Sequence, residues 1–265
     1  MKRSDASMIM KIAVMSRLGL SNRYAMCAGC KVDCRTRLSG FHFMPGGRVT
    51  YERAQRVRTI RGLLSALAKR IQESHSMSTA NMNADDDAIV AATRQWLERA
   101  VIGLNLCPFA KSVYVKEQVR YVVSNATTPE ALLETLMDEL QRLSDTPAEA
   151  VDTTLLIHPF VLTNFEDYNE FLDVADAAVE DMQLDGELQV ASFHPDYQFA
   201  DTDVNDISNY TNRAPYPILH LLREDSIARA VDAFPDAADI FEKNIDTMER
   251  LGHDGWDKLD VGPAR

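Results

Sequence analysis

The fold is decided by two short stretches, TTLLIHP at residues 153–159 and LQVASFHP at residues 188–195. Each is a run rich in apolar and β-branched residues, typical of a buried strand, and each stops at a His-Pro pair. Between them, apolar residues from Phe165 to Met182 recur at helical spacing. A strand, a crossover helix and a second strand form a unit with parallel strands. We therefore predict that both His-Pro pairs lie at the same edge of one sheet.

The segments on either side extend this pattern. Apolar runs at Val119–Val123 and Ile218–Leu222 predict two more strands, and amphipathic segments predict further helices before, between and after them. The predicted fold class is α/β, a layered structure with a small four-stranded mixed sheet, partly parallel, covered by about five helices. Pro108 should end the first helix near Cys107, and Gly252 should cap the last one.

Charge divides the chain near residue 80. Up to that residue there are 15 Lys and Arg against 4 Asp and Glu, and the remainder has 13 against 36, within a total net charge of −12. One folding unit rarely separates its charges so sharply. We expect residues 1–80 to be a basic N-terminal extension, disordered or produced by a misassigned start, and residues 81–265 to be a single acidic α/β domain.

The basic extension has one cluster of metal-type residues. Cys27, Cys30, Cys34 and His42 are of the kinds that bind zinc, but the usual second Cys-x2-Cys or His-x3-His pair is missing. A second interpretation is that translation starts at Met77, just before a strong helix. A third is a basic regulatory or nucleic-acid-binding arm. The misassigned start explains the break in composition most simply.

Composition excludes several classes of function for the acidic domain. Its negative charge would repel a nucleic-acid backbone. No run of about 18 apolar residues is present, so we expect no membrane span. Cys107 is its single cysteine, which excludes an internal disulfide and fits a cytoplasmic protein. Motifs for nucleotide-cradling glycine loops, serine hydrolases and His-Glu-x-x-His metalloproteases are absent.

Histidines at the strand ends are the main candidates for chemistry. His158 and His194 should meet at the sheet edge where open α/β sheets usually bind ligands. They would act as acid–base groups or, with His220 in the fourth strand, as ligands of a divalent metal such as zinc or iron. The alternative is that each imidazole only bonds a loop carbonyl, and that His220 is a hydrogen-bonded core residue.

The long polar segment 196–217 leaves the same edge and predicts a binding loop. Its candidate substrate-binding residues are Tyr197, Asn209, Asn212 and Arg213. A guanidinium among amide side chains suits a carboxylate or phosphate. The alternative is a self-satisfied surface loop in which Arg213 pairs with Asp206.

Two candidates lie elsewhere in the pattern. Arg223 ends the fourth strand and either binds substrate or forms an ion pair with Glu224 or Asp225 at a helix start. Cys107 would be a nucleophile if a histidine lowered its pKa, as in a hydrolase or transferase. A small buried cysteine with no reactivity is the alternative.

Several blocks of the acidic domain resemble a bacterial family catalogued as domain of unknown function 1415, over roughly residues 88–250. The blocks are WL at 96–97, VIGLNLCPFA at 101–110, HP at 158–159, YN at 168–169, FL at 171–172, QVASFHP at 189–195, NYTNR at 209–213, PYP at 215–217 and LHLLRE at 219–224. Ala214 stands where the family pattern leads us to expect a serine. The resemblance implies that residues 1–80 lie outside the family domain and that the His, Asn and Arg positions belong to one shared site. It implies no particular reaction.

The leading hypothesis is an enzyme that acts on a small anionic molecule with a His/Arg/Asn site, metal-assisted or not. The second is a non-catalytic domain whose acidic surface binds a basic protein. The third is a hydrolase or transferase that depends on Cys107.

Overall fold

The computed structural model describes residues 86–233 and 239–264. The boundary near residue 80 and the cluster of Cys27, Cys30, Cys34 and His42 lie outside these residues. The elements in chain order are α3 (Asp86–Trp96), η1 (Leu97–Ile102), α4 (Ala110–Val115), β1 (Val119–Val123), α5 (Pro129–Asp145), β2 (Thr153–Ile157), α6 (Phe165–Asp181), β3 (Leu188–Phe193), η2 (Ile207–Thr211), β4 (Ile218–Arg223), α7 (Glu224–Ala233) and α8 (Ile240–Asp257).

The strands form one mixed sheet in the order β1-β2-β4-β3. β1 and β2 are parallel, whereas β4 is antiparallel to both of its neighbours. The sequence prediction of a four-stranded, partly parallel sheet is confirmed. β2 and β3 point the same way, as predicted, but β4 lies between them. Ile157 and Phe193, the last residues of these two strands, both pair with Ile218, so the two His-Pro pairs do share one sheet edge.

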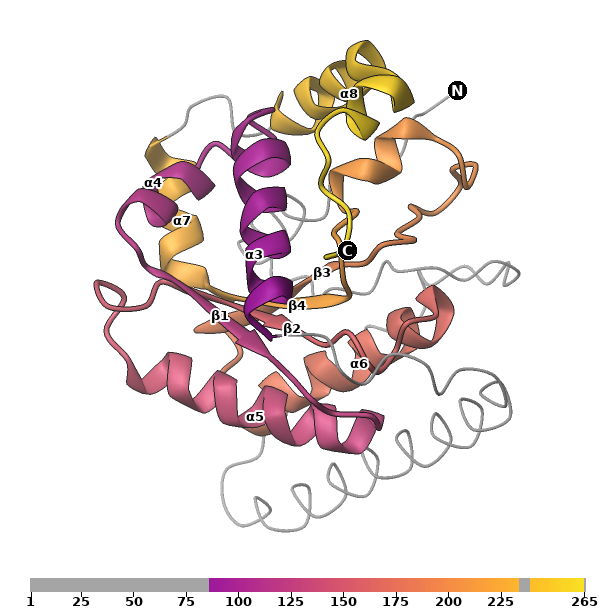
Figure 1. The fold of residues 1–265 in the computed structure, drawn as a ribbon. Helices are drawn as coiled ribbons and strands as arrows, with labels where there is room; N and C mark the ends of the chain where they lie inside the picture. Colours follow the sequence, from indigo (N-terminus) through magenta and orange to yellow (C-terminus); the bar gives the residue numbers. More distant parts are fainter. Residues whose placement is uncertain (1–85, 234–238, 265) are drawn as a thin grey trace, which may run out of the picture.

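Helices cover both faces of the sheet (Figure 1). α5 and α6 lie on one side, and α3, α4 and α7 lie on the other. The first side has a core that includes Leu136, Leu156, Phe171 and Leu219, and the second packs Trp96 against Phe193 with ring centroids 5.1 Å apart. Burial of these apolar side chains is the main force that holds the layers together.

Local sequence signals explain where α5 and α6 begin. Thr128 caps α5, because its side chain accepts a hydrogen bond from the Ala131 amide, and Pro129 occupies the first turn, where no amide donor is needed. Asn164 caps α6 by accepting from the amides of Glu166 and Asp167. The cap orients the start of α6 immediately after the His158-Pro159 pair.

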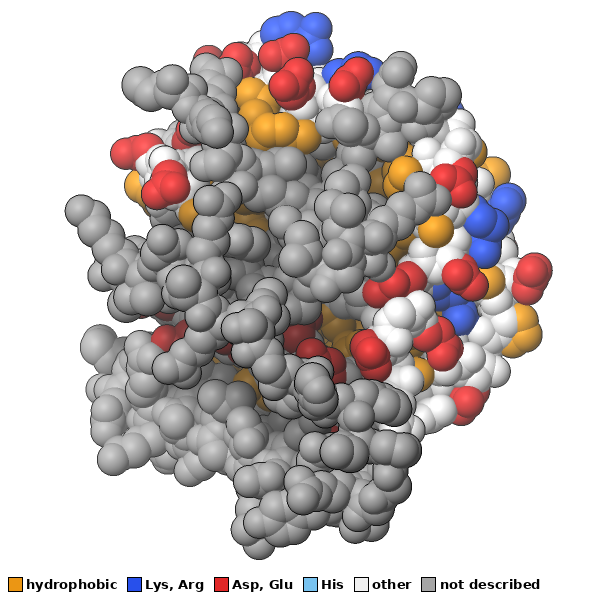
Figure 2. Space-filling model, turned by 180° about the vertical axis from the view of Figure 1, so that it is seen from behind, with side chains coloured by type: hydrophobic (Ala, Val, Ile, Leu, Met, Phe, Trp, Pro, Cys, Tyr) orange, Lys and Arg blue, Asp and Glu red, His pale blue; other side chains and the backbone are white. Residues whose placement is uncertain are grey.

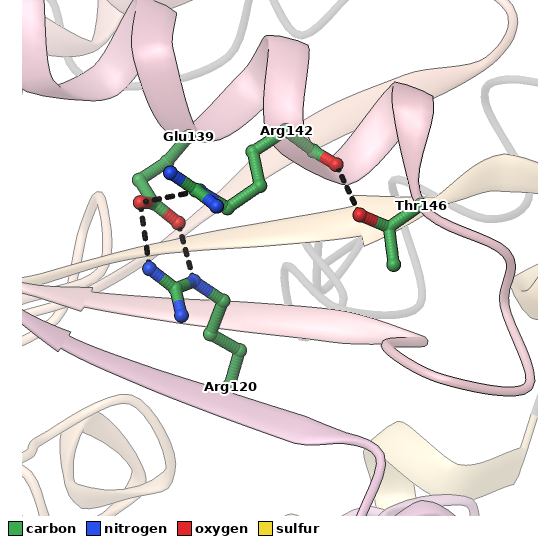
Figure 3. A network of polar contacts seen from close by, with 4 residues as sticks. All are labelled: Arg120, Glu139, Arg142 and Thr146. Carbon is green, nitrogen blue, oxygen red and sulfur yellow. Dashed lines mark hydrogen bonds and ion pairs between the residues drawn. The ribbon is translucent and has the colours of Figure 1, made fainter.

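A buried ion pair joins β1 to α5 (Figure 3). Arg120 donates to both carboxylate oxygens of Glu139, at 2.7 and 3.0 Å, and Arg142 lies 3.4 Å from the same carboxylate. The Glu139 side chain is only 8% exposed, so its charge depends on these partners. Edge strand β1 is therefore tied to the helix layer through charge as well as apolar contact.

The end of the first helix differs from the sequence prediction. The first helix continues as a π-helix, η1, and ends at Ile102, and α4 follows Pro108 as an additional short helix, so that the described residues contain six α-helices. Gly103 is required after η1, since a Cβ there would lie 2.3 Å from the Arg99 carbonyl oxygen. At Gly252, which has a φ of 63°, α8 is broken by a kink, so that one helical segment ends at the predicted glycine and a second follows it. Among the described residues, no helix has the length and hydropathy to span a bilayer.

Candidate functional site

His158 follows β2 with its ring fully buried against α6. Its amide donates to the Pro217 carbonyl at 3.0 Å, which fixes the backbone at the start of β4. Nδ1 lies 3.0 Å from the Val161 carbonyl oxygen. A carbonyl only accepts, so Nδ1 carries the proton and Nε2 is the unprotonated nitrogen. Nε2 is buried and has no hydrogen-bond partner in the described part of the chain.

His194 follows β3 and is also fully buried, but both of its nitrogens are engaged. Nδ1 accepts from the Asp196 amide at 3.0 Å, so the proton sits on Nε2, which lies 3.3 Å from the Leu162 carbonyl oxygen. The two imidazoles thus bind successive carbonyls of the segment 159–164. Leu162 in that segment has a positive φ of 56°, a conformation that only surrounding contacts can maintain.

Tyr168 of α6 connects the two histidines. Its ring centroid lies 5.7 Å from that of His158 in a stacked arrangement and 5.1 Å from that of His194. Its hydroxyl donates to the Ile218 carbonyl at 2.8 Å, so the ring is held in place by the strand between β2 and β3. From the sequence, Tyr168 was recognised as part of a helix and of the YN block, but not as a residue of the site. The sequence signal that could have placed it there is its position in the first turn of α6, the helix that follows the His158-Pro159 pair.

Burial determines the charge of both imidazoles. Burial and, to a smaller extent, the nearby His194 lower the pKa of His158 to about 4, against the raising effect of the Val161 bond. Burial also lowers the pKa of His194 to about 4, and Arg213 adds to this, although Asp196 opposes it. Both rings are therefore neutral at pH 7. His158 presents a free lone pair in a buried, weakly polar environment.

The loop from residue 196 to 217 contains its own secondary structure, the 3₁₀ helix η2. Asn209 is fully buried and organises the loop: its Oδ1 accepts from the Phe199 amide and the Thr202 hydroxyl, and its Nδ2 donates to the Asp203 carbonyl. Asn212 is buried and donates to the Ser192 carbonyl at 3.2 Å. Asn209 thus holds the loop together, and Asn212 ties the loop to β3.

Arg213 and Tyr197 also hold the loop. The Arg213 guanidinium donates to the carbonyls of Tyr197 at 3.2 Å and Val204 at 2.8 Å, and its Cζ lies 4.2 Å from the centre of the Tyr210 ring. These acceptors differ from Asp206, the ion-pair partner considered in the sequence analysis. Tyr197 is buried, with its ring 5.2 Å from that of Phe165. Of the loop candidates, Arg213 brings a positive charge to the His194 side of the site.

The remaining candidates lie away from the two histidines. His220 pairs with Leu155 in the sheet and contacts Phe193, so it faces α3, on the opposite side from His158 and His194. Arg223 is at the other end of β4. It donates to the carbonyls of Leu143, Thr146 and Val151, at the C-terminal end of α5 and in the segment that leads to β2. The proposed ligand set of His158, His194 and His220 is thus not brought together. No group of three or more His, Cys, Asp or Glu side chains able to hold a metal occurs in residues 86–233 and 239–264.

Cys107 is half-buried and packs with the α3 side of the core. Burial raises the pKa of its thiol, and the backbone amides of Phe109 and Ala110 only partly oppose this. A raised pKa disfavours the thiolate that a nucleophilic cysteine needs. The geometry therefore favours the interpretation of Cys107 as a packing residue.

A family model described as "Protein of unknown function (DUF1415)" matches residues 88–258. The chain belongs to this family. The match spans β1 to β4 and all of α8, and so contains every residue of the site described above. No curated protein and no solved structure matches the chain. DUF1415 membership therefore confirms the family resemblance and leaves the reaction to be inferred from the site.

Proposed function

We propose that this protein is a cytosolic enzyme that acts on a small anionic molecule, with His158 as the group that accepts a proton. One observation carries the proposal: Nε2 of His158 is buried and has no partner among the described residues. The Val161 carbonyl fixes the tautomer in which this nitrogen is unprotonated and can accept a proton. A catalytic base is commonly oriented by a second group in this way. His194, with both nitrogens bonded, is a positioning residue.

The low proton affinity of His158 favours an anionic substrate. A base with a pKa of about 4 removes protons poorly at pH 7. A negative charge placed beside the ring stabilises the imidazolium and raises that pKa toward neutrality. Arg213, in the loop that leaves this edge, carries a positive charge that would attract such an anion. The base would become effective only when its substrate is bound.

Access to His158 requires a change in the covering segment. The ring is fully buried, and the carbonyls of Val161 and Leu162 bond the two imidazoles. Leu162 in this segment has a positive φ of 56°, so a rearrangement of the segment would relieve local backbone strain. We infer that a substrate enters by displacing residues 159–164 and that their closure excludes water from the base.

Ligand-dependent stability tests the proposal. Thermal unfolding of the purified full-length chain is followed with orthophosphate, acetate, malonate and citrate as probes. A probe at about one hundred times its Kd should stabilise the protein by about 2.7 kcal/mol. The variant His158→Phe, which keeps a buried ring but removes the lone pair, should abolish the effect, whereas His253→Gln, at an exposed histidine, should retain it. No stabilisation by any probe, or equal stabilisation of His158→Phe, contradicts the proposal.

A second candidate function is supported by the composition of α6. The sequence of this helix, FEDYNEFLDVADAAVED, has seven acidic residues and no Lys or Arg. Acidic side chains are also spread over the described part of the face in Figure 2. Such a surface suits a basic protein partner. Charge reversal at Glu166, Asp173 and Glu180, which are exposed, should abolish capture of a basic partner, and Arg213→Lys should not.

A further inference from the structure

The sheet face toward α3 contains a second histidine with a free nitrogen. Thr153 donates its hydroxyl proton to the Leu221 carbonyl at 2.6 Å, and the same oxygen lies 2.7 Å from Nε2 of His220. The hydroxyl has one proton, so Nε2 of His220 must be the donor in this contact. Nδ1 of His220 is then an unprotonated acceptor. It is buried and has no partner among the residues that the structure describes.

A matching donor lies on the neighbouring strand. Ala191 pairs with His220, so Gln189, two residues earlier in β3, has its side chain on the same face. Nε2 of Gln189 is buried and likewise lacks a partner within the described residues. The hydroxyl oxygen of Tyr121 is a third buried polar atom without a partner among the described residues. Tyr121 lies on β1 and pairs with Leu155, the residue that pairs with His220.

Buried polar atoms without partners are costly, and native proteins keep few of them. Here an acceptor and a donor occupy adjacent strands on one face, and their side chains are only half-buried. If His220 and Gln189 served only to pack the sheet, apolar residues in their place would avoid the cost of burying two unpartnered nitrogens.

We propose that His220 and Gln189 form a second binding site, for the hydroxyl or primary amide group of a small neutral molecule. Such a group donates to Nδ1 of His220 and accepts from Nε2 of Gln189 at the same time. A carboxylate or other anionic group has no proton to donate to Nδ1 of His220 and would be repelled by the lone pair of this nitrogen. This chemistry differs from that proposed for His158, which lies on the other side of the sheet, so the two proposals stand or fall separately.

The charge state of His220 agrees with a neutral ligand. Burial lowers the pKa of His220 to about 4, so the ring is uncharged at pH 7. The Thr153 bond keeps its proton on Nε2 and its acceptor directed away from β2. Thr153 is a positioning residue in this site, since Thr153→Val would release the ring to exchange tautomers while leaving Nδ1 and Gln189 in place.

Nitrogen-15 NMR of the histidine rings in the full chain provides the test, with acetamide as the probe and N,N-dimethylacetamide, which has no N–H donor, as its matched control. Acetamide should shift the Nδ1 resonance of His220 in a saturable way, and dimethylacetamide should not. In Gln189→Leu the acetamide affinity should fall about fivefold, as expected for one lost neutral hydrogen bond. His253→Gln should bind as the wild type does.

Two results would overturn the proposal. The first is an Nδ1 resonance that is already hydrogen-bonded without a probe and does not respond to acetamide, because an ordered water then satisfies His220. The second is the same acetamide affinity in Gln189→Leu as in the wild type. The unfolding free energy gives an independent check: Gln189→Leu should raise it if the amide is unsatisfied in the free protein, and loss of stability would indicate that the amide is already bonded.

Discussion

Acidification should unfold this protein through its buried histidines. The pKa values of His158 and His194 are about 4 in the folded protein, against an ordinary value of 6.5. Because the folded values are lowered, each neutral ring contributes stability that is complete above pH 6.5 and is lost as the pH falls toward 4. Between pH 7 and pH 5 the unfolded chain takes up protons at these positions and the folded chain does not.

The size of the effect follows from the two pKa values. Proton linkage gives a loss of about 2 kcal/mol per histidine between pH 7 and pH 5. His220, with a pKa of about 4, contributes in the same direction. A small domain has about 5–15 kcal/mol in total, so a loss of about 6 kcal/mol from the three histidines should remove a large part of the stability near pH 5.

One carboxyl group opposes this trend. Burial and the charges of Asp173 and Glu180 raise the pKa of Asp176 to about 7. Its folded pKa lies above the unfolded value, so its charged form destabilises the fold above pH 7 and this penalty declines as the pH falls. The measurement is therefore best made in an Asp176→Asn background, which removes the opposing contribution.

Urea unfolding followed by circular dichroism at several pH values between 7 and 5 measures the linkage. In His194→Gln the fall in unfolding free energy over this range should be about 2 kcal/mol smaller than in the parent. His253→Gln is the comparison for loss of a histidine at the surface. A parent protein whose unfolding free energy stays constant from pH 7 to pH 5 would refute the argument that these imidazoles are buried and neutral.

Three further predictions concern the framework of the site. Gly103→Ala should lower the unfolding free energy by about 1–3 kcal/mol in thermal unfolding, because its Cβ would meet the Arg99 carbonyl; unchanged stability would exclude that contact. Arg120→Met should cost about 1–3 kcal/mol in urea unfolding because Glu139 stays buried, whereas the double variant Arg120→Met/Glu139→Gln should recover part of that loss. Asn209→Ala should reduce hydrogen-exchange protection of the Phe199 amide while leaving that of β2 unchanged, and equal loss at both would indicate global destabilisation.

The sequence was sufficient for the strands because their apolar runs are bounded by clear signals. TTLLI and LQVASF each stop at His-Pro, and the expected bounds of β1, β2 and β3 agree with the structure. The position of β4 could not be predicted, since pairing between Ile157, Phe193 and Ile218 depends on contacts distant in sequence. The end of η1 at Ile102, before the expected stop near Cys107, also escaped prediction.

For the candidate site, the sequence predicted the shared edge of the two His-Pro pairs but not the contacts that surround them. Strand direction was enough to bring His158 and His194 to one edge. Which side of the sheet each histidine faces depends on register, and this separates His220 from the pair. Tautomers depend on individual acceptors, such as the Val161 carbonyl, which no sequence pattern indicates. Tyr168 was missed because an aromatic residue on a helix face is usually a core residue.

The insertion of β4 between β2 and β3 has a consequence for the order of folding. While the chain is being synthesised, β1 and β2 can pair as soon as they emerge, but β3 has no neighbour until Ile218–Arg223 arrives. The backbone bond from His158 to Pro217 also forms only then. Long-range pairing of this kind is slow and leaves strand edges exposed. A nascent chain that stops before residue 218 should thus depend on chaperones, and the site should assemble in the last step of folding.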